Sequence, residues 1–181
     1  MARRRIFSVG HSTHELVDFV RLLSSYDVEQ LCDVRRHPGS RRMPWFKQEV
    51  LDRELVRQGV VYRHLPELGG RRRPVRDTPN GGWRVEAFRG YADHMASAEF
   101  AAGLDVLEQL ATERSTTMMC AEGPWWRCHR RLISDALTLR GWGVIHIGPD
   151  GGATQHELTR FAVVEDGHLT YPPLQASLDT G

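Results

Sequence analysis

Short apolar segments alternate with amphipathic ones along this chain of 181 residues, and the alternation limits the folds open to it. Segments with the character of buried strands lie at 5–9, 29–34, 60–65, 115–120 and 142–147. Helical spacing of apolar residues follows 12–15 and recurs over 46–57, 86–96, 98–113 and 127–140. Parallel strands joined by helices need right-handed crossovers, which cover both faces of the sheet. We therefore expect a three-layer α/β fold with a mainly parallel sheet of about five strands.

Local signals refine this expectation. Residues 12–15 have the form of a capping box, and Ser97 is a candidate cap for the helix over 98–113. Residues 66–85 are rich in proline and glycine, which predicts a long loop. The tail suggests a short helix around 155–161 and a small hairpin after it.

Length and composition predict a single domain over residues 1–181. The chain is 40% hydrophobic and 26% charged, which excludes a disordered tail, a coiled coil and a collagen. Its apolar runs fall far short of the roughly 20 residues that span a bilayer, so no membrane partner is expected. The basic start lacks the apolar stretch of a signal peptide, and Cys32, Cys120 and Cys128 form no even disulfide set. We therefore expect a cytoplasmic protein.

The loops that follow the predicted strands carry most of the arginine clusters and four of the five tryptophans. Because the carboxyl ends of parallel strands meet at one edge, these loops are expected to form one rim. Guanidinium groups bind phosphate in pairs of hydrogen bonds, and tryptophans stack on bases, so nucleic acid, DNA foremost, is the expected partner. The candidate substrate-binding residues on this rim are Ser12, Arg35, Arg36, Arg41, Arg42, Glu67, Arg71, Arg72, Trp83, Arg84, Trp125, Arg127, His129 and Arg130.

Several motifs occur in an order that resembles domain-of-unknown-function family 488. They are VGHST at 9–13, DVR at 33–35 with SRR at 40–42, LPELGG at 65–70, FRGY at 88–91, and MCAE at 119–122 with CHR at 128–130. The resemblance runs from about residue 5 to 160 and leaves 161–181 as an extension. It implies an α/β fold and a cytoplasmic bacterial or archaeal protein.

The expected function is a DNA glycosylase that excises a modified or damaged base. Carboxylates at the rim suit this reaction, because they can activate water or stabilise an oxocarbenium-like sugar. Glu122 or Asp33 would take this role, while His11, Ser12 and His129 would position the base or its sugar. Trp83 or Trp125 would fill the gap left by the flipped nucleotide. Alternatively, Glu122 forms a salt bridge with Arg127 or Arg130, and Asp33 simply holds Arg35 or a loop amide.

Cys120 supports a different hypothesis. It ends a predicted strand, and an arginine follows seven positions on at a helix start, so it could be the nucleophile of a phosphatase or sulfurtransferase on a small anionic substrate. A buried structural cysteine is equally compatible with the pattern. Cys120, Cys128 and His129 could also join His11, His146 or His156 around zinc, but no close Cys-x-x-Cys pair is present, so neither metal nor cofactor is expected. A third alternative is a non-enzymatic nucleic-acid-binding module.

Overall fold

The computed structural model describes residues 4–173. Its strands are β1 (Arg5–Gly10), β2 (Gln30–Asp33), β3 (Val61–His64), β4 (Thr116–Cys120), β5 (Gly143–Ile147), β6 (Ala153–Gln155), β7 (Val163–Glu165) and β8 (His168–Thr170). Its α-helices are α1 (Leu16–Ser24), α2 (Gln48–Arg57), α3 (Glu86–His94), α4 (Ala98–Glu113) and α5 (Arg130–Leu139). Single 3₁₀ turns occupy Pro44–Phe46, Pro66–Leu68 and Trp125–Arg127.

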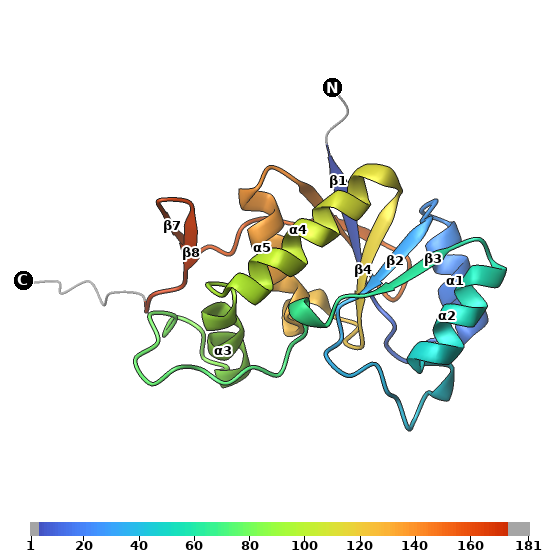
Figure 1. The fold of residues 1–181 in the computed structure, drawn as a ribbon, viewed down its shortest axis with the longest axis horizontal. Helices are drawn as coiled ribbons and strands as arrows, with labels where there is room; N and C mark the ends of the chain where they lie inside the picture. The colour runs from blue at the N-terminus through green and yellow to red at the C-terminus, as the bar shows by residue number, and fades with distance from the viewer. Residues whose placement is uncertain (1–3, 174–181) are drawn as a thin grey trace, which may run out of the picture.

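The central sheet has six strands in the order β3-β2-β4-β1-β5-β6 (Figure 1). The first five are parallel, and β6 pairs antiparallel with β5. The predicted three-layer α/β fold with a mainly parallel sheet is therefore confirmed, with one strand more than expected. The second sheet is the small β7–β8 hairpin, which the sequence also predicted.

Helices cover both faces of the sheet, and two separate apolar clusters result. Phe19 and Leu23 of α1 pack with Leu51 and Leu55 of α2 against one face. The other face contacts α3, α4 and α5, through Tyr91, Phe100, Leu104, Leu132 and Ile133 among others. Strands buried on both faces read as nearly continuous apolar runs, which is why the sequence reveals them clearly. No helix in the described part of the chain is long and apolar enough to cross a membrane.

Three local predictions meet different outcomes. Ser97 does cap α4, since its side chain accepts a hydrogen bond from the Phe100 amide at 3.1 Å. The capping box at 12–15 is wrong: α1 begins at Leu16, and no side chain caps it. Instead, the Ser12 amide donates to the Ala121 carbonyl at 2.9 Å, which ties this loop to the end of β4. The short helix around 155–161 is also wrong: Gln155 ends the edge strand β6, which pairs with β5, and residues 156–161 form no helix.

The order of the strands places a crevice at the carboxyl ends of β1 and β4. These two strands are neighbours, yet α1, which follows β1, and α5, which follows β4, pack on opposite faces of the sheet. Loops that leave a sheet in opposite directions open a crevice between them, which is where α/β proteins bind ligands.

Candidate functional site

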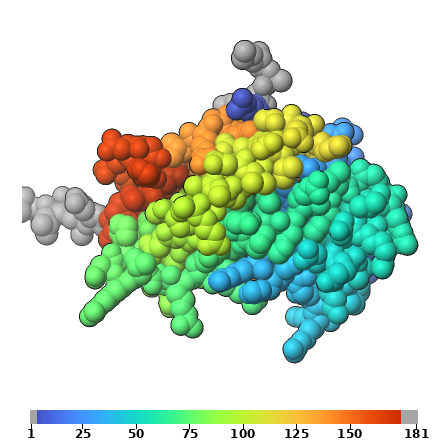
Figure 2. All heavy atoms as spheres, in the orientation of Figure 1, coloured from blue at the N-terminus to red at the C-terminus, as the bar shows by residue number. Residues whose placement is uncertain are grey.

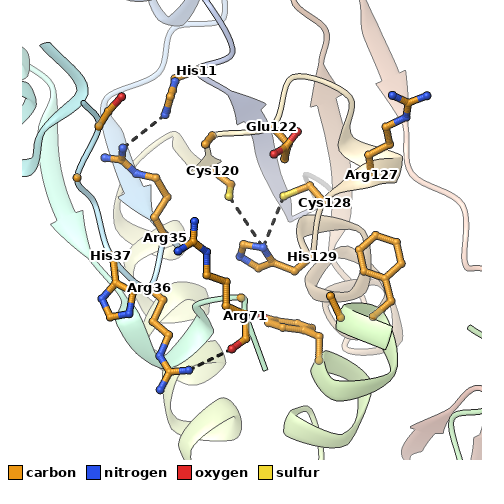
Figure 3. Close-up of a pocket in the computed structure, with 17 residues that line it drawn as sticks. His11, Arg35, Arg36, His37, Arg71, Cys120, Glu122, Arg127, Cys128 and His129 are labelled. Atoms are coloured by element: carbon orange, nitrogen blue, oxygen red, sulfur yellow. Dashed lines mark hydrogen bonds between the residues drawn. The ribbon is translucent and has the colours of Figure 1, made fainter. Parts of the chain in front are cut away.

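A cavity of about 350 Å³ opens at this crevice (Figure 3). Loops after β1, β2, β3 and β4 contribute to its wall, as the sequence led us to expect, and α3 closes one side with Phe88 and Tyr91. Its charged wall is mostly basic, with Arg35, Arg36, Arg71 and Arg127. Glu122 is the only carboxylate among the described residues that line it. The cavity therefore suits an anionic ligand of moderate size.

Two cysteines and a histidine meet at the floor of the cavity. Cys120 ends β4, while Cys128 and His129 follow the turn Trp125–Arg127, just before α5. The His129 Nδ1 atom lies 3.6 Å from the Cys128 sulfur and 3.9 Å from the Cys120 sulfur. The His129 Nε2 atom lies 3.0 Å from the Val34 carbonyl oxygen, which can only accept. The proton is therefore on Nε2, and the Nδ1 lone pair faces both sulfur atoms.

Arg130 lies beneath this cluster with none of its surface exposed. Its Nη1 donates to the Ser8 hydroxyl at 3.0 Å, and its Nη2 donates to the carbonyls of Glu122 and Gly123. No carboxylate within the described residues pairs with it, and its Nε atom donates to the Cys128 sulfur at 3.4 Å. A buried guanidinium needs a compensating negative charge, so a thiolate at Cys128 is the group that fits.

The two thiols therefore differ in acidity. Burial opposes ionisation of Cys128, but the hydrogen bond with Cys120 and the neighbouring positive charge of Arg130 hold the pKa of the Cys128 thiol well below its ordinary value. The hydrogen bond to Cys128, together with burial, raises the pKa of Cys120 well above its ordinary value. Cys128 is therefore the more acidic of the two coupled thiols.

A buried ion pair fixes the adjacent wall. Asp33 is fully buried, and its carboxylate accepts hydrogen bonds from Arg35, at 2.6 Å for the shortest, and from the Tyr62 hydroxyl at 2.7 Å. Arg35 in turn donates to the His11 Nε2 atom at 3.4 Å. The His11 Nδ1 atom lies 3.1 Å from the Ser12 carbonyl and donates to it. Asp33 thus holds Arg35, one of the alternatives raised by the sequence, and burial together with the charge of Arg35 lowers the pKa of His11.

A comparison with protein families identifies the relatives of this chain. A family model described as domain of unknown function DUF488 matches residues 15–137. The chain belongs to the DUF488 family. The DUF488 match covers the cysteines, His129 and Arg130, while His11 precedes it. Comparisons with curated proteins and with solved structures found no match.

The DUF488 cavity brings together about half of the residues that the sequence singled out. Those that line it are His11, Arg35, Arg36, Arg71, Cys120, Glu122, Arg127 and His129. Those that do not are Ser12, Asp33, Arg41, Arg42, Glu67, Arg72, Trp83, Arg84, Trp125 and Arg130. Asp33 and Arg130 act from beneath, Asp33 through its ion pair with Arg35 and Arg130 through its hydrogen bond to Cys128. Arg72 pairs with Glu99 at 3.0 Å.

Neither tryptophan proposed to fill the gap of a flipped nucleotide lines the cavity. Trp83 is 5% exposed and packs in the core against Phe88, Phe161 and Tyr171. Trp125 stacks on His146 with ring centroids 4.1 Å apart. The aromatic wall comes from Phe88 and Tyr91 instead. These two lie three residues apart on α3, inside the FRGY motif, so the motif and its helical spacing were the available signals.

A second buried network lies under Trp125. The His146 Nε2 and His156 Nδ1 atoms are 2.9 Å apart, and His156 Nε2 is 2.8 Å from the Asp135 carboxylate. The Tyr171 hydroxyl donates to the same carboxylate at 2.8 Å, and the Tyr171 amide donates to Asn80 at 2.9 Å. Burial and the charge of His156 lower the pKa of His146 to about 2. The network connects α5 to the last described segment of the chain.

We expect the DUF488 protein to lose stability as the pH falls from about 6.5 towards 4, partly through His11. Burial and the charge of Arg35 lower the pKa of His11 from 6.5 to about 4. Between these values the unfolded chain binds a proton that the folded chain does not, so acid favours unfolding. Urea unfolding of His11→Gln, measured between pH 7.5 and 4.5, should show a pH slope smaller by up to roughly 1.4 kcal/mol per pH unit. An unchanged slope would show that His11 titrates normally in the folded protein.

Proposed function

We propose that this DUF488 protein hydrolyses the N-glycosidic bond of a modified or damaged base in DNA. The observation that carries the proposal is the position of Glu122, the single carboxylate among the described lining residues, in a wall otherwise charged by arginines. A carboxylate beside phosphate-binding groups can stabilise an oxocarbenium-like sugar or accept the proton of an attacking water. Its three cysteines are free, in keeping with action in the reducing cytoplasm, where DNA also lies.

The shape of the cavity supports a nucleotide as the group that enters it. A volume of about 350 Å³ lies at the lower end of the range typical of small-molecule sites. Phe88, which is partly exposed beside the buried Tyr91, offers an aromatic face on which a base can stack, in the role that the sequence assigned to tryptophan. The exposed arginines of the cavity wall, Arg36, Arg71 and Arg127, can meet a phosphate group.

The surface around the cavity supports the binding of a nucleic-acid strand longer than one nucleotide. Figure 2 shows the light-blue and green segments, which include the loops after β2 and β3, projecting from one edge of the molecule. Exposed arginines in these loops are Arg36, Arg41, Arg42, Arg71, Arg73, Arg76 and Arg84. Neutralised phosphates release counterions, so binding through such residues weakens steeply with salt.

The substitution Glu122→Gln tests the proposal. With DNA oligonucleotides that carry individual modified bases, we expect base release to fall by at least about 100-fold while DNA affinity, measured by fluorescence anisotropy, is retained. Glu113→Gln, an exposed glutamate at the end of α4, is the matched control and should keep full activity. Full base release by Glu122→Gln would refute the role of this residue. Salt-dependent binding without any product would identify a non-enzymatic module instead.

A further inference from the structure

We propose that Cys120, Cys128 and His129 form a binding site for one zinc ion, with a fourth coordination position that opens into the cavity. The two sulfur atoms and one imidazole nitrogen all lie within 4.8 Å of one another. They come from two separate segments, the end of β4 and the start of α5, which the fold brings to one point (Figure 3). The inference rests on this cluster and does not depend on the proposed function.

The distances fit tetrahedral coordination of zinc. With Zn–S bonds of about 2.3 Å and Zn–N bonds of about 2.0 Å, a sulfur and a nitrogen ligand in tetrahedral coordination lie about 3.5 Å apart. The His129 Nδ1 atom is 3.6 Å from the Cys128 sulfur and 3.9 Å from the Cys120 sulfur. Both nitrogen–sulfur distances thus match tetrahedral zinc to within a few tenths of an ångström, and all three ligand atoms lie within 4.8 Å of one another.

The surroundings of His129 prepare it as a ligand. The Val34 carbonyl binds the Nε2 proton, which leaves the Nδ1 lone pair free and fixes the plane of the ring. Partners of this kind orient metal-bound histidines in known sites. The backbone of Gly70 lies against the same ring, and a Cβ atom at position 70 would lie only 2.8 Å from Nδ1. A glycine here keeps open the space beside the proposed ion.

The surroundings of the cysteines fit thiolate ligands. Arg130 donates from Nε to the Cys128 sulfur at 3.4 Å, and its buried positive charge favours negative charge on sulfur. Thiolate and imidazole ligands favour zinc over magnesium or calcium, which prefer oxygen. Three protein ligands with an open fourth position are typical of catalytic zinc, which lowers the pKa of its bound water to about 7. Such a water would lie on the cavity floor, with Glu122 in the wall.

Metal binding can be measured without any substrate. Protein stripped with a chelator under reducing conditions is titrated with zinc in competition with a chromophoric chelator, and separately with Co²⁺. We expect one ion per chain and a thiolate-to-cobalt charge-transfer absorption. Cys120→Ser and Cys128→Ser should each weaken zinc binding by at least about 100-fold. Cys32→Ser is the matched control, because burial raises the pKa of Cys32 to about 12 and it lies outside the cluster.

A second measurement uses the unaltered protein, in case the serine variants do not fold. Zinc should protect Cys120 and Cys128 from alkylation at pH 7.5, as read by mass spectrometry at each residue, and a chelator should remove the protection. Absence of stoichiometric binding, or unchanged alkylation in saturating zinc, would overturn the proposal. Fast alkylation of either cysteine despite zinc would instead favour the thiol-dependent enzyme. A zinc-binding protein that releases no base would leave this inference intact and refute only the proposed function.

Discussion

Replacing Arg130 with methionine is expected to lower the free energy of unfolding by about 3–5 kcal/mol. Methionine keeps much of the side-chain length but removes every N–H group. The carbonyls of Glu122 and Gly123 and the Ser8 hydroxyl then lose their donor in a place that water does not reach. Each buried polar group left without a partner costs about 1–3 kcal/mol. The Cys128 sulfur also loses the positive charge beside it.

The effect is measured by urea unfolding with chelator and reductant present, so that neither metal nor oxidation contributes. Arg127→Met is the matched control, since Arg127 lines the same cavity but is exposed. Exposed substitutions of this kind change stability by within about 0.5 kcal/mol. If Arg130→Met were as stable as Arg127→Met, the buried guanidinium would contribute nothing to folding and would not balance a thiolate at Cys128.

Asp33→Asn is the second substitution with a large expected effect. It leaves Arg35, which is 6% exposed, without the carboxylate that accepts its hydrogen bonds, and it sets an amide against the Tyr62 hydroxyl. Breaking one partner of a buried ion pair typically costs about 3–5 kcal/mol. We expect a loss of this size in urea unfolding, and weaker DNA binding because Arg35 is no longer held in the cavity wall.

A double-mutant cycle separates the ion pair from other effects of the substitution. Arg35→Met removes the charge that Asp33→Asn leaves unpaired, so the double variant should be less destabilised than the sum of the two single variants. The coupling energy is expected to be at least about 1 kcal/mol. Additive losses would show that Asp33 and Arg35 act independently, and that the contact between them does not position the guanidinium.

The sequence was most informative where the local structure depends on a single short segment of the chain. The apolar runs predicted β1 to β5, because burial on both faces leaves a nearly continuous hydrophobic pattern. The rule that ligands bind at the carboxyl ends of parallel strands then placed Cys120 and Glu122 at one edge, and both line the cavity. Neither inference required any knowledge of how distant segments pack.

The predictions that failed concern residues whose surroundings are set by segments far away in the sequence. Trp83 lies among arginines in a loop, a pattern that suggested an exposed stacking residue. In the structure Phe161 and Tyr171, far along the chain, pack around it, and its neighbours in sequence carry no sign of this. Gln155, where the sequence suggested the start of a helix, instead ends the edge strand β6, because β5 offers this segment unpaired backbone groups. The contacts of Asp33 with Arg35 and Tyr62 also join distant segments, since Tyr62 comes from β3.

The contacts of Tyr171 bear on the order in which the site forms during synthesis. Tyr171 is fully buried and joins the Asp135 carboxylate in α5 to Asn80 in the loop before α3. A ribosome releases the chain from its N-terminal end, so Asp135 emerges well before the hydroxyl that will bind it. Until then the Asp135 carboxylate on α5 lacks the hydrogen bond from the Tyr171 hydroxyl. The buried network beside α5 can therefore be completed only after residue 171 has left the ribosome.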